Sequence, residues 1–231
     1  MSFKNVDNLE DYVALLEDQP SELQTLSQDF LIRVTSFFRD AETYARLQSI
    51  VLPSMLRNRP PESPIRLWIA GCSTGEEVYS LAIALVECLG DMVNNTPVKI
   101  LATDISDAAL EKARVGRYID NIALDVSPER LRRFFTKSNG CYQVSKSIRD
   151  LCVFSKHNVT RDTPFANLDL ISCRNVLIYF DDASRKAVVD HFYNALKSGG
   201  FIFLGHSESI GRISTAFKLL RVGQHLVYRK E

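Results

Sequence analysis

Two carboxylates stand directly after a glycine-containing turn. The run Gly71-Cys72-Ser73-Thr74-Gly75-Glu76-Glu77 follows the apolar residues 65–70, a pattern typical of a strand that turns tightly into a helix. Such a turn can bind a phosphate at the helix N-terminus. Here Glu76 and Glu77 would repel a pyrophosphate and attract a cation. The chemistry indicated is therefore recognition of a positively charged group.

A third carboxylate, Asp104, ends the apolar segment 98–103. A carboxylate in this position can accept hydrogen bonds from both ribose hydroxyls, and its other possible role, capping the next helix, can be filled by Ser106. A ligand with a ribose and two cationic centres is S-adenosylmethionine. The alternative for Glu76 and Glu77 is that they only stabilise the helix dipole, by about 0.3–1 kcal/mol.

Further polar residues follow other predicted strands. Ligands of open parallel sheets bind at the carboxyl ends of the strands, and Asn158, Arg174-Asn175 and His206 are all expected at such ends. For His206 we favour a hydrogen-bonded histidine at a strand end over a catalytic role. This convergence of polar groups at one sheet edge is more informative than the glycine turn alone.

The cysteines indicate no metal centre and no disulfide framework. They stand at positions 72, 88, 141, 152 and 173, with neither a CxxC pair nor a histidine at zinc-ligand spacing. Cys72 and Cys173 lie beside predicted site residues, but an isolated cysteine in an apolar run is more often a packing residue. We therefore assign no catalytic role to any cysteine.

Composition and charge exclude several classes of protein. The 231 residues are 45% hydrophobic and 24% charged, and no apolar stretch approaches the roughly 18 to 20 residues of a membrane helix. Residues 1–7 lack the apolar core of a signal peptide, so we expect a cytoplasmic protein without nucleic-acid partners or membrane insertion. Residues 1–34 are acidic, whereas residues 130–161 carry eight basic residues against Asp150. That basic segment is either a solvated surface or a contact for an acidic partner.

The first part of the chain has helical periodicity. Two short helices are expected within residues 8–34 and a third over residues 41–57, kinked or shortened at Pro53. Residues 1–57 would thus form a short N-terminal helical region. Residues 58–64, with three prolines, are expected to be a linker to the domain of residues 65–231.

The rest of the chain alternates strands and helices, which predicts an α/β, Rossmann-like parallel sheet with helices on both faces. The expected strands are 65–70, 98–103, 168–173 and 201–204, with an antiparallel pair over 217–229. The expected helices are 77–89, a helix capped by Ser106-Asp107 that runs to about 115, and 181–197 closed by Gly199-Gly200. Residues 141–145 and 151–154 suggest a small antiparallel β insertion at about 130–160.

Five motifs in order resemble CheR, the chemotaxis receptor methyltransferase family, over roughly residue 30 to the end. They are Thr35-x-Phe37-Phe38-Arg39-Asp40, Gly71 to Glu77 followed by x-Tyr79-Ser80, Ala102-Thr103-Asp104-Ile105, Cys173-Arg174-Asn175-Val176-x-Ile178-Tyr179-Phe180 and Gly205-His206-Ser207-Glu208. The resemblance implies transfer of a methyl group from S-adenosylmethionine to glutamates on the cytoplasmic helices of a chemoreceptor. The products would be glutamyl methyl esters and S-adenosylhomocysteine, with no metal.

The resemblance also implies roles for individual residues. Thr35 and Arg39 would contact the methionine portion of the cofactor, with Gly71 in the turn, Glu76 beside the amino end and Asp104 on the ribose. Asn158-Val159 and Asn175-Val176 match positions that line the adenosine and methionine pocket. For catalysis, Arg39, Arg174 and Tyr179 would position the incoming carboxylate, although Arg39 as a surface ion-pair residue and Tyr179 as a packing residue are alternatives.

Three departures from the family pattern concern the substrate side. Arg33 stands where many relatives have Asn, the N-terminal region is short and acidic, and the β insertion is compact. We expect a monomer or a module of a larger signalling protein that meets its receptor through the basic segment 130–161. Two alternative functions remain open: methylation of another protein or a small acid, and a module that binds the cofactor without turnover.

Overall fold

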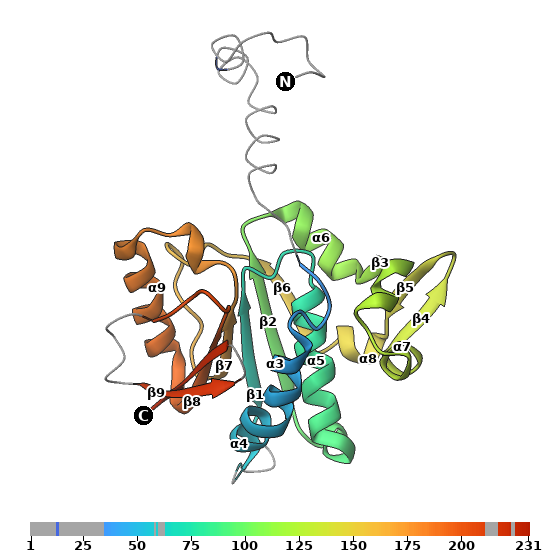
Figure 1. Ribbon diagram of the computed structural model, residues 1–231, viewed down its shortest axis with the longest axis horizontal. Coiled ribbons are helices and arrows are strands. Elements are labelled where there is room, and N and C mark those ends of the chain that lie inside the picture. The colour runs from blue at the N-terminus through green and yellow to red at the C-terminus, as the bar shows by residue number, and fades with distance from the viewer. Residues whose placement is uncertain (1–12, 14–34, 58, 60–62, 211–216, 223–224) are drawn as a thin grey trace. The chain divides into compact units, whose positions relative to one another are not determined.

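A sheet of seven strands, β6-β2-β1-β7-β8-β10-β9 in spatial order, forms the centre of the fold (Figure 1). The computed structural model describes residues 13, 35–57, 59, 63–210, 217–222 and 225–231. Residues 35–231 form one compact unit, and residues 1–34 are a separate one. Apart from residue 13, the two helices predicted within residues 8–34 lie outside the described residues.

The predicted parallel α/β arrangement is confirmed. In the sheet, β1 pairs in parallel with β2 and β7, β2 with β6, and β7 with β8, whereas β10 is antiparallel to both β8 and β9. The strands are β1 (Ile65–Ala70), β2 (Val98–Asp104), β6 (Cys152–Lys156), β7 (Leu168–Cys173), β8 (Leu196–Leu204), β9 (Phe217–Val222) and β10 (His225–Lys230). After β1, the chain adds β2 and β6 on one side of β1, and then crosses to add β7 and β8 on its other side. Ligand crevices form at the switch point between two such strands, here β1 and β7.

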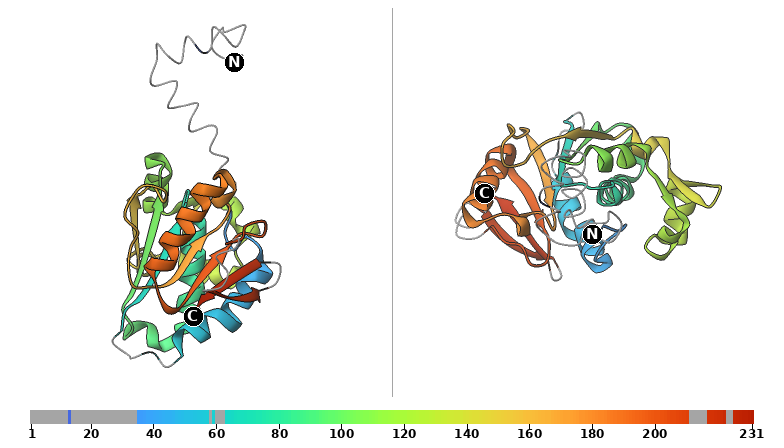
Figure 2. Two further views of the ribbon diagram at one scale, coloured as in Figure 1. Left: turned by 90° about the vertical axis from the view of Figure 1, so that its left-hand side faces the viewer. Right: turned by 90° about the horizontal axis from the view of Figure 1, so that it is seen from above.

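Alternate residues of each strand face opposite sides of the sheet, as period-two geometry requires. Leu67 and Ile69 pack into one core, and Trp68 into the other. The two views of Figure 2 show α5 (Glu76–Leu89) and α9 (Asp182–Ala195) on opposite faces. The remaining helices are α3 (Ala41–Arg46), η1 (Leu47–Val51), α4 (Leu52–Leu56), η2 (Gly90–Asn94), α6 (Asp107–Val115), η3 (Asp120–Leu124), α7 (Pro128–Phe134), α8 (Lys146–Arg149) and η4 (Leu177–Tyr179).

Local signals placed several helix ends correctly. Ser106 Oγ caps α6 by accepting a hydrogen bond from the backbone N–H of Ala109, and Asp181 caps α9 through the N–H of Ser184. The helical stretch predicted over residues 41–57 is present as α3, η1 and α4. Its π-helical turn, η1, ends just before Pro53, where the lost backbone N–H was expected to disturb the helix.

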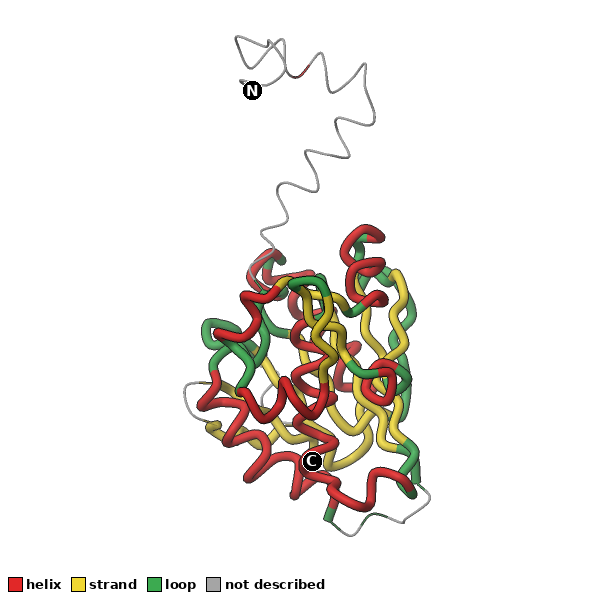
Figure 3. The backbone as a smooth tube through the Cα atoms, turned by 90° about the vertical axis from the view of Figure 1, so that its right-hand side faces the viewer, coloured by secondary structure: helices red, strands yellow, loops and turns green. Residues whose placement is uncertain are grey.

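The antiparallel insertion lies earlier in the chain than predicted. Its strands β3 (Arg117–Ile119), β4 (Phe135–Ser138) and β5 (Cys141–Val144) pair in the order β3-β5-β4. Figure 3 views the molecule from the side on which these strands lie in Figure 1. The strand predicted at residues 151–154 is part of β6, which pairs in parallel with β2 in the main sheet. A short β-rich segment carries no local signal for which sheet it joins, so the antiparallel assignment of 151–154 was wrong.

The glycine pair Gly199-Gly200 does not close a helix. Helix α9 ends at Ala195, and β8 begins at once with Leu196, so both glycines lie within the strand. The register between β7 and β8 is irregular between Leu168 and Leu170. Glycines within a strand commonly mark such an irregularity, which explains this difference from the prediction.

An ionic cluster joins residues that precede the sheet to the amino end of β7. The Asp169 side chain is buried and accepts hydrogen bonds from Arg59 Nη1 at 2.8 Å, Lys197 Nζ at 2.9 Å and the backbone N–H of Arg66 at 2.8 Å. A carboxylate buried in this way requires such partners.

Within the described ranges, no helix combines the length and apolar character needed to cross a bilayer.

Candidate functional site

The loops that follow β1 and β7 touch each other at the switch point. Gly71, the first residue after β1, has a φ of +72°, and a Cβ built on it would lie 2.3 Å from Val176 Cγ2. Any larger residue at position 71 would collide with the β7 loop and would be strained in this conformation. The glycine therefore brings the two loops together.

Asp104 joins the glycine loop to the start of α6. Its Oδ2 accepts the backbone N–H of Ser73 at 2.8 Å, and its Oδ1 accepts the N–H of Ser106 at 2.9 Å. The helix cap itself is Ser106, as the sequence allowed. Each oxygen of a carboxylate has more than one acceptor site, so Asp104 keeps capacity for hydroxyl donors.

Glu76 and Glu77 point to different surroundings. Thr74 Oγ1 lies 2.9 Å from Glu76 Oε1 and 2.7 Å from Oε2, and burial raises the pKa of Glu76 in spite of this hydrogen bond. Glu77 instead accepts from Ser172 Oγ at 2.6 Å and from Arg174 Nη1 at 3.3 Å. Of the two carboxylates considered for a cation, Glu76 is the one that lines a cavity.

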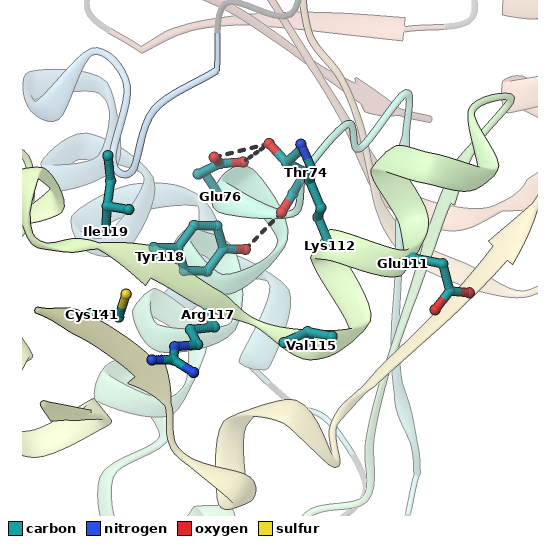
Figure 4. A pocket seen from close by; sticks show the side chains of 9 residues that line it. All are labelled: Thr74, Glu76, Glu111, Lys112, Val115, Arg117, Tyr118, Ile119 and Cys141. Carbon is teal, nitrogen blue, oxygen red and sulfur yellow. Dashed lines mark hydrogen bonds between the residues drawn. The ribbon is translucent and has the colours of Figure 1, made fainter. Parts of the chain in front are cut away.

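That cavity, of about 550 Å³, lies between the glycine loop, α6 and the small sheet (Figure 4). Glu76 and Thr74 line it from the loop side, Lys112 and Val115 from α6, and Tyr118 from β3. The Tyr118 hydroxyl donates to the Thr74 carbonyl at 2.7 Å. Sequence reasoning missed Tyr118, because nothing local indicates that β3 of the insertion returns to the glycine loop.

The bend over residues 35–40 is held by packing and by hydrogen bonds of its backbone. Phe37 and Phe38 are buried, and the N–H of Phe38 donates to Ser80 Oγ at 2.9 Å. The Phe37 ring meets the edge of Tyr118 with 4.9 Å between centroids. Thr35 and Arg39 are half-buried residues of this bend. The bend therefore contacts both α5 and the wall of the cavity.

Arg174 lies beneath the bend. Its side chain is 1% exposed, and Nη2 donates to the Arg39 carbonyl at 3.3 Å and to Asp40 Oδ2 at 2.5 Å, while Nη1 reaches Glu77. Tyr179, at the end of η4, is 55% exposed. Of the three side chains predicted to meet a substrate carboxylate, Arg174 is thus buried, Arg39 is half-buried and Tyr179 is exposed.

Glu208 organises the β7 loop, a role that sequence reasoning missed. The carboxylate is 3% exposed. Its Oε1 accepts the backbone N–H groups of Val176 and Leu177, and its Oε2 accepts those of Asn175 and Gly205, at 2.7 to 2.8 Å. Asn175 has a φ of +58°, which asparagine tolerates better than most residues. The Gly-His-Ser-Glu motif marked the position of Glu208 but not its partners.

Asn158 and Val159 follow β6 and are half-buried. The Asn158 side-chain carbonyl accepts from the N–H of Thr160 at 3.0 Å and from its hydroxyl at 2.7 Å, which leaves the amide N–H groups for other acceptors. Asn158, Asn175 and Asp104 do not line the cavity beside Glu76, although their strands end at the same edge of the sheet.

The two cysteines next to the site are buried thiols. Burial raises the pKa of both Cys72 and Cys173 well above the ordinary value, so the reactive thiolate is disfavoured. Among the described residues, no group of three or more histidines, cysteines and carboxylates is placed to hold a metal ion.

The Rossmann-like sheet, with carboxylates after its first two strands, fits the class of S-adenosylmethionine-dependent methyltransferases, and the family match that follows shows this class. Residues 33–225 match the family described as "CheR methyltransferase, SAM binding domain". The chain belongs to this family, which confirms the resemblance read from its five motifs.

Relatives match nearly the whole chain. "Chemotaxis protein methyltransferase 2" of Vibrio cholerae serotype O1 is 36% identical over 95% of this chain and 77% of its own length. "Chemotaxis protein methyltransferase 1" of Pseudomonas aeruginosa is 31% identical over 99% of this chain and 85% of its own length. A Rhodobacter capsulatus protein, "Uncharacterized 104.1 kDa protein in hypE 3'region", is 36% identical over 95% of this chain, which spans only 23% of that protein.

Proposed function

We propose that this chain transfers the methyl group of S-adenosylmethionine to glutamate side-chain carboxylates of a chemoreceptor, forming glutamyl methyl esters. The observation that carries the proposal is the pairing of a CheR family match over residues 33–225 with an acidic site in which Asp104 and Glu76 flank the glycine loop. The relatives from Vibrio cholerae and Pseudomonas aeruginosa, named as chemotaxis protein methyltransferases, support it.

The donor set of the site fits this cofactor. Asp104 offers acceptor capacity for the ribose hydroxyls, and Glu76 offers a carboxylate to the ammonium group. Thr35 and Arg39 approach from the bend, while Val159 and Val176 supply apolar surface beside Asn158 and Asn175. When bound, the cofactor supplies an electrophilic methyl group on a sulfonium sulfur.

The residues of the chain position the reactants and exclude water. A glutamate side chain has a pKa near ~4.3 and is already ionised at neutral pH, so the displacement requires no strong general base. In this proposal Tyr179, which is exposed, and Arg39, which is half-buried, meet the incoming carboxylate. Arg174 contributes indirectly, by holding the bend in place. Its guanidinium binds the Arg39 carbonyl and Asp40 and does not reach the surface.

Several basic residues of the segment 130–161 are already paired within the chain, so only part of the segment is available to a receptor. Lys137, Lys146 and Lys156 pair with acidic residues of the chain, and Arg130 pairs with Glu87. Arg161 is also exposed and outside the ion pairs of the described residues, but it is isolated from the other arginines in sequence. Arg132 and Arg133 lie together on α7, both are exposed, and none of the described acidic residues forms an ion pair with them. We therefore assign the docking of an acidic receptor helix to these two arginines.

The test is methylation of a purified receptor cytoplasmic fragment with methyl-labelled cofactor. The expected result is label on the receptor that is released as methanol by mild base, as methyl esters require. The matched control is a receptor fragment whose methyl-accepting glutamates are replaced by alanine. Absence of base-labile label, with S-adenosylhomocysteine binding established by calorimetry, would refute receptor methylation and leave a cofactor-binding module.

A further inference from the structure

Arg130 is the first arginine of the basic segment, and it is turned inward. Its Nε donates to Glu87 Oε1 at 2.9 Å and its Nη2 to Glu87 Oε2 at 2.7 Å, a two-point contact between α7 and α5. Gln48 of η1 completes the cluster, accepting from Arg130 Nη2 at 3.1 Å and donating to Glu87 Oε2 at 2.7 Å. Three elements far apart in the sequence meet at one guanidinium.

The same guanidinium lies on the bend. Its central carbon is 4.0 Å from the centroid of the Phe38 ring, well within the range of a cation–π contact. Phe38 is 4% exposed and has a φ of +47°, a conformation unfavourable for an aromatic residue. Such a conformation persists only where the surroundings enforce it. Arg130 holds the Phe38 ring, and Ser80 Oγ holds its backbone N–H.

Glu87 contributes charge to this arrangement. Burial alone would raise its pKa, but the hydrogen bonds from Arg130 and Gln48 outweigh burial, and the pKa of Glu87 is lowered. The carboxylate is therefore ionised at neutral pH and keeps the Arg130 guanidinium oriented over the ring. Arg132, two residues further along α7, is exposed and outside this cluster.

We propose that Arg130 is a positioning residue for cofactor binding: it fixes Phe38, and thereby sets the bend that carries Thr35 and Arg39. The inference rests on the proposed function, in which those two residues contact the cofactor. It makes the insertion, through α7, part of the cofactor site, although no atom of Arg130 lines the cavity beside Glu76.

The experiment measures S-adenosylhomocysteine affinity by calorimetry for Arg130→Ala, Arg130→Lys and the matched control Arg132→Ala. We expect about tenfold weaker binding for Arg130→Ala, equivalent to about 1.4 kcal/mol. Arg130→Lys keeps the charge beside Glu87 but loses the guanidinium over the Phe38 ring and the two-point contact with Glu87, so it should fold and also bind more weakly. In turnover, Arg130→Ala should raise KM for the cofactor and leave KM for the receptor fragment unchanged.

Two further variants separate positioning from general stability. Gln48→Ala removes one member of the cluster without touching the Phe38 stack, so it should lower the melting temperature but not the cofactor affinity. Phe38→Leu should weaken binding, and the Arg130→Ala/Phe38→Leu double variant should be no weaker than the poorer single variant.

Other outcomes overturn the inference. Binding by Arg130→Ala within twofold of the natural protein, additive losses in the double variant, or equal loss in Gln48→Ala would each show that Arg130 does not position the bend. Failure of the natural protein to bind S-adenosylhomocysteine would instead refute the proposed function.

Discussion

Replacement of Glu208 by glutamine tests how the β7 loop is built. The glutamate carboxylate accepts four backbone N–H groups, from Gly205, Asn175, Val176 and Leu177, and is almost fully buried. In Glu208→Gln an amide NH2 replaces one oxygen. Whichever way the amide turns, two of the four donors then face another donor. Each buried donor left without an acceptor costs about 1–3 kcal/mol, so the variant should lose about 2–6 kcal/mol of unfolding free energy.

Urea unfolding, followed by circular dichroism, measures this loss, with Ser207→Ala as a control at an exposed neighbouring position. Because Asn175 and Val176 belong to the same loop, calorimetry should also show weaker S-adenosylhomocysteine binding for Glu208→Gln. A loss of stability below about 1 kcal/mol would refute the reasoning, since it would mean that the four N–H groups find other acceptors at little cost.

Further predictions concern the acidic site and the docking surface. Asp104→Ala should weaken S-adenosylhomocysteine binding at least about tenfold. It should also destabilise the fold by about 2 kcal/mol, because two backbone N–H groups lose their acceptor. Unchanged affinity in calorimetry would contradict the ribose contact. Because burial raises the pKa of Glu76 above 4.5, its carboxylate takes up a proton at a higher pH than an exposed glutamate. Affinity should therefore fall as the pH is lowered from about 7 to about 5, and a pH titration of Glu76→Gln should show weaker binding without this dependence. The lowered pKa of Glu87 gives stability that is present above 4.5 and lost as the pH falls through its folded-state pKa, so thermal unfolding of Glu87→Gln should change less with acid; an unaltered acid profile would count against that pairing. Charge reversal at Arg132 and Arg133 should slow receptor methylation while calorimetry shows unchanged cofactor affinity, and a joint loss of both would argue against docking by α7.

The fold was predictable wherever short-range chemistry decides it. Ser106 and Asp181 mark helix starts because a side-chain oxygen must accept an orphan N–H, and the structure has both caps. The strand at residues 151–154 was placed in the wrong sheet, since period and composition do not specify a pairing partner. Gly199-Gly200 likewise fits a helix end and a strand irregularity equally well in sequence.

For the candidate site, the sequence located the residues but not their partners. Asp104 and Glu76 stand where strand ends predict them, because the carboxyl ends of parallel strands share one edge. The burial of Arg174 under the bend and three of the four contacts of Glu208 depend on residues more than thirty positions away. No local pattern encodes such distances. The cofactor roles of these residues remain predictions until a ligand is bound.

Strand β7 is tied at both ends to chain that precedes β1. At its amino end Asp169 binds Arg59, and just past its carboxyl end Arg174 binds Asp40. Between Asp40 and Arg59 run α3, η1 and α4, whose sixteen residues span about 24 Å at about 1.5 Å per residue. Six residues of β7 span about 20 Å at about 3.3 Å each.

The length of the helical stretch therefore nearly equals the length of β7, so both ion pairs can form at the same time. A deletion of one residue within it would draw the two ties about 1.5 Å closer and turn one relative to the other by about 100°. Either Asp40 or Arg59 would then lose its partner. We expect this stretch to accept many exchanges on its exposed face, such as at Ile50, but no change in its number of residues.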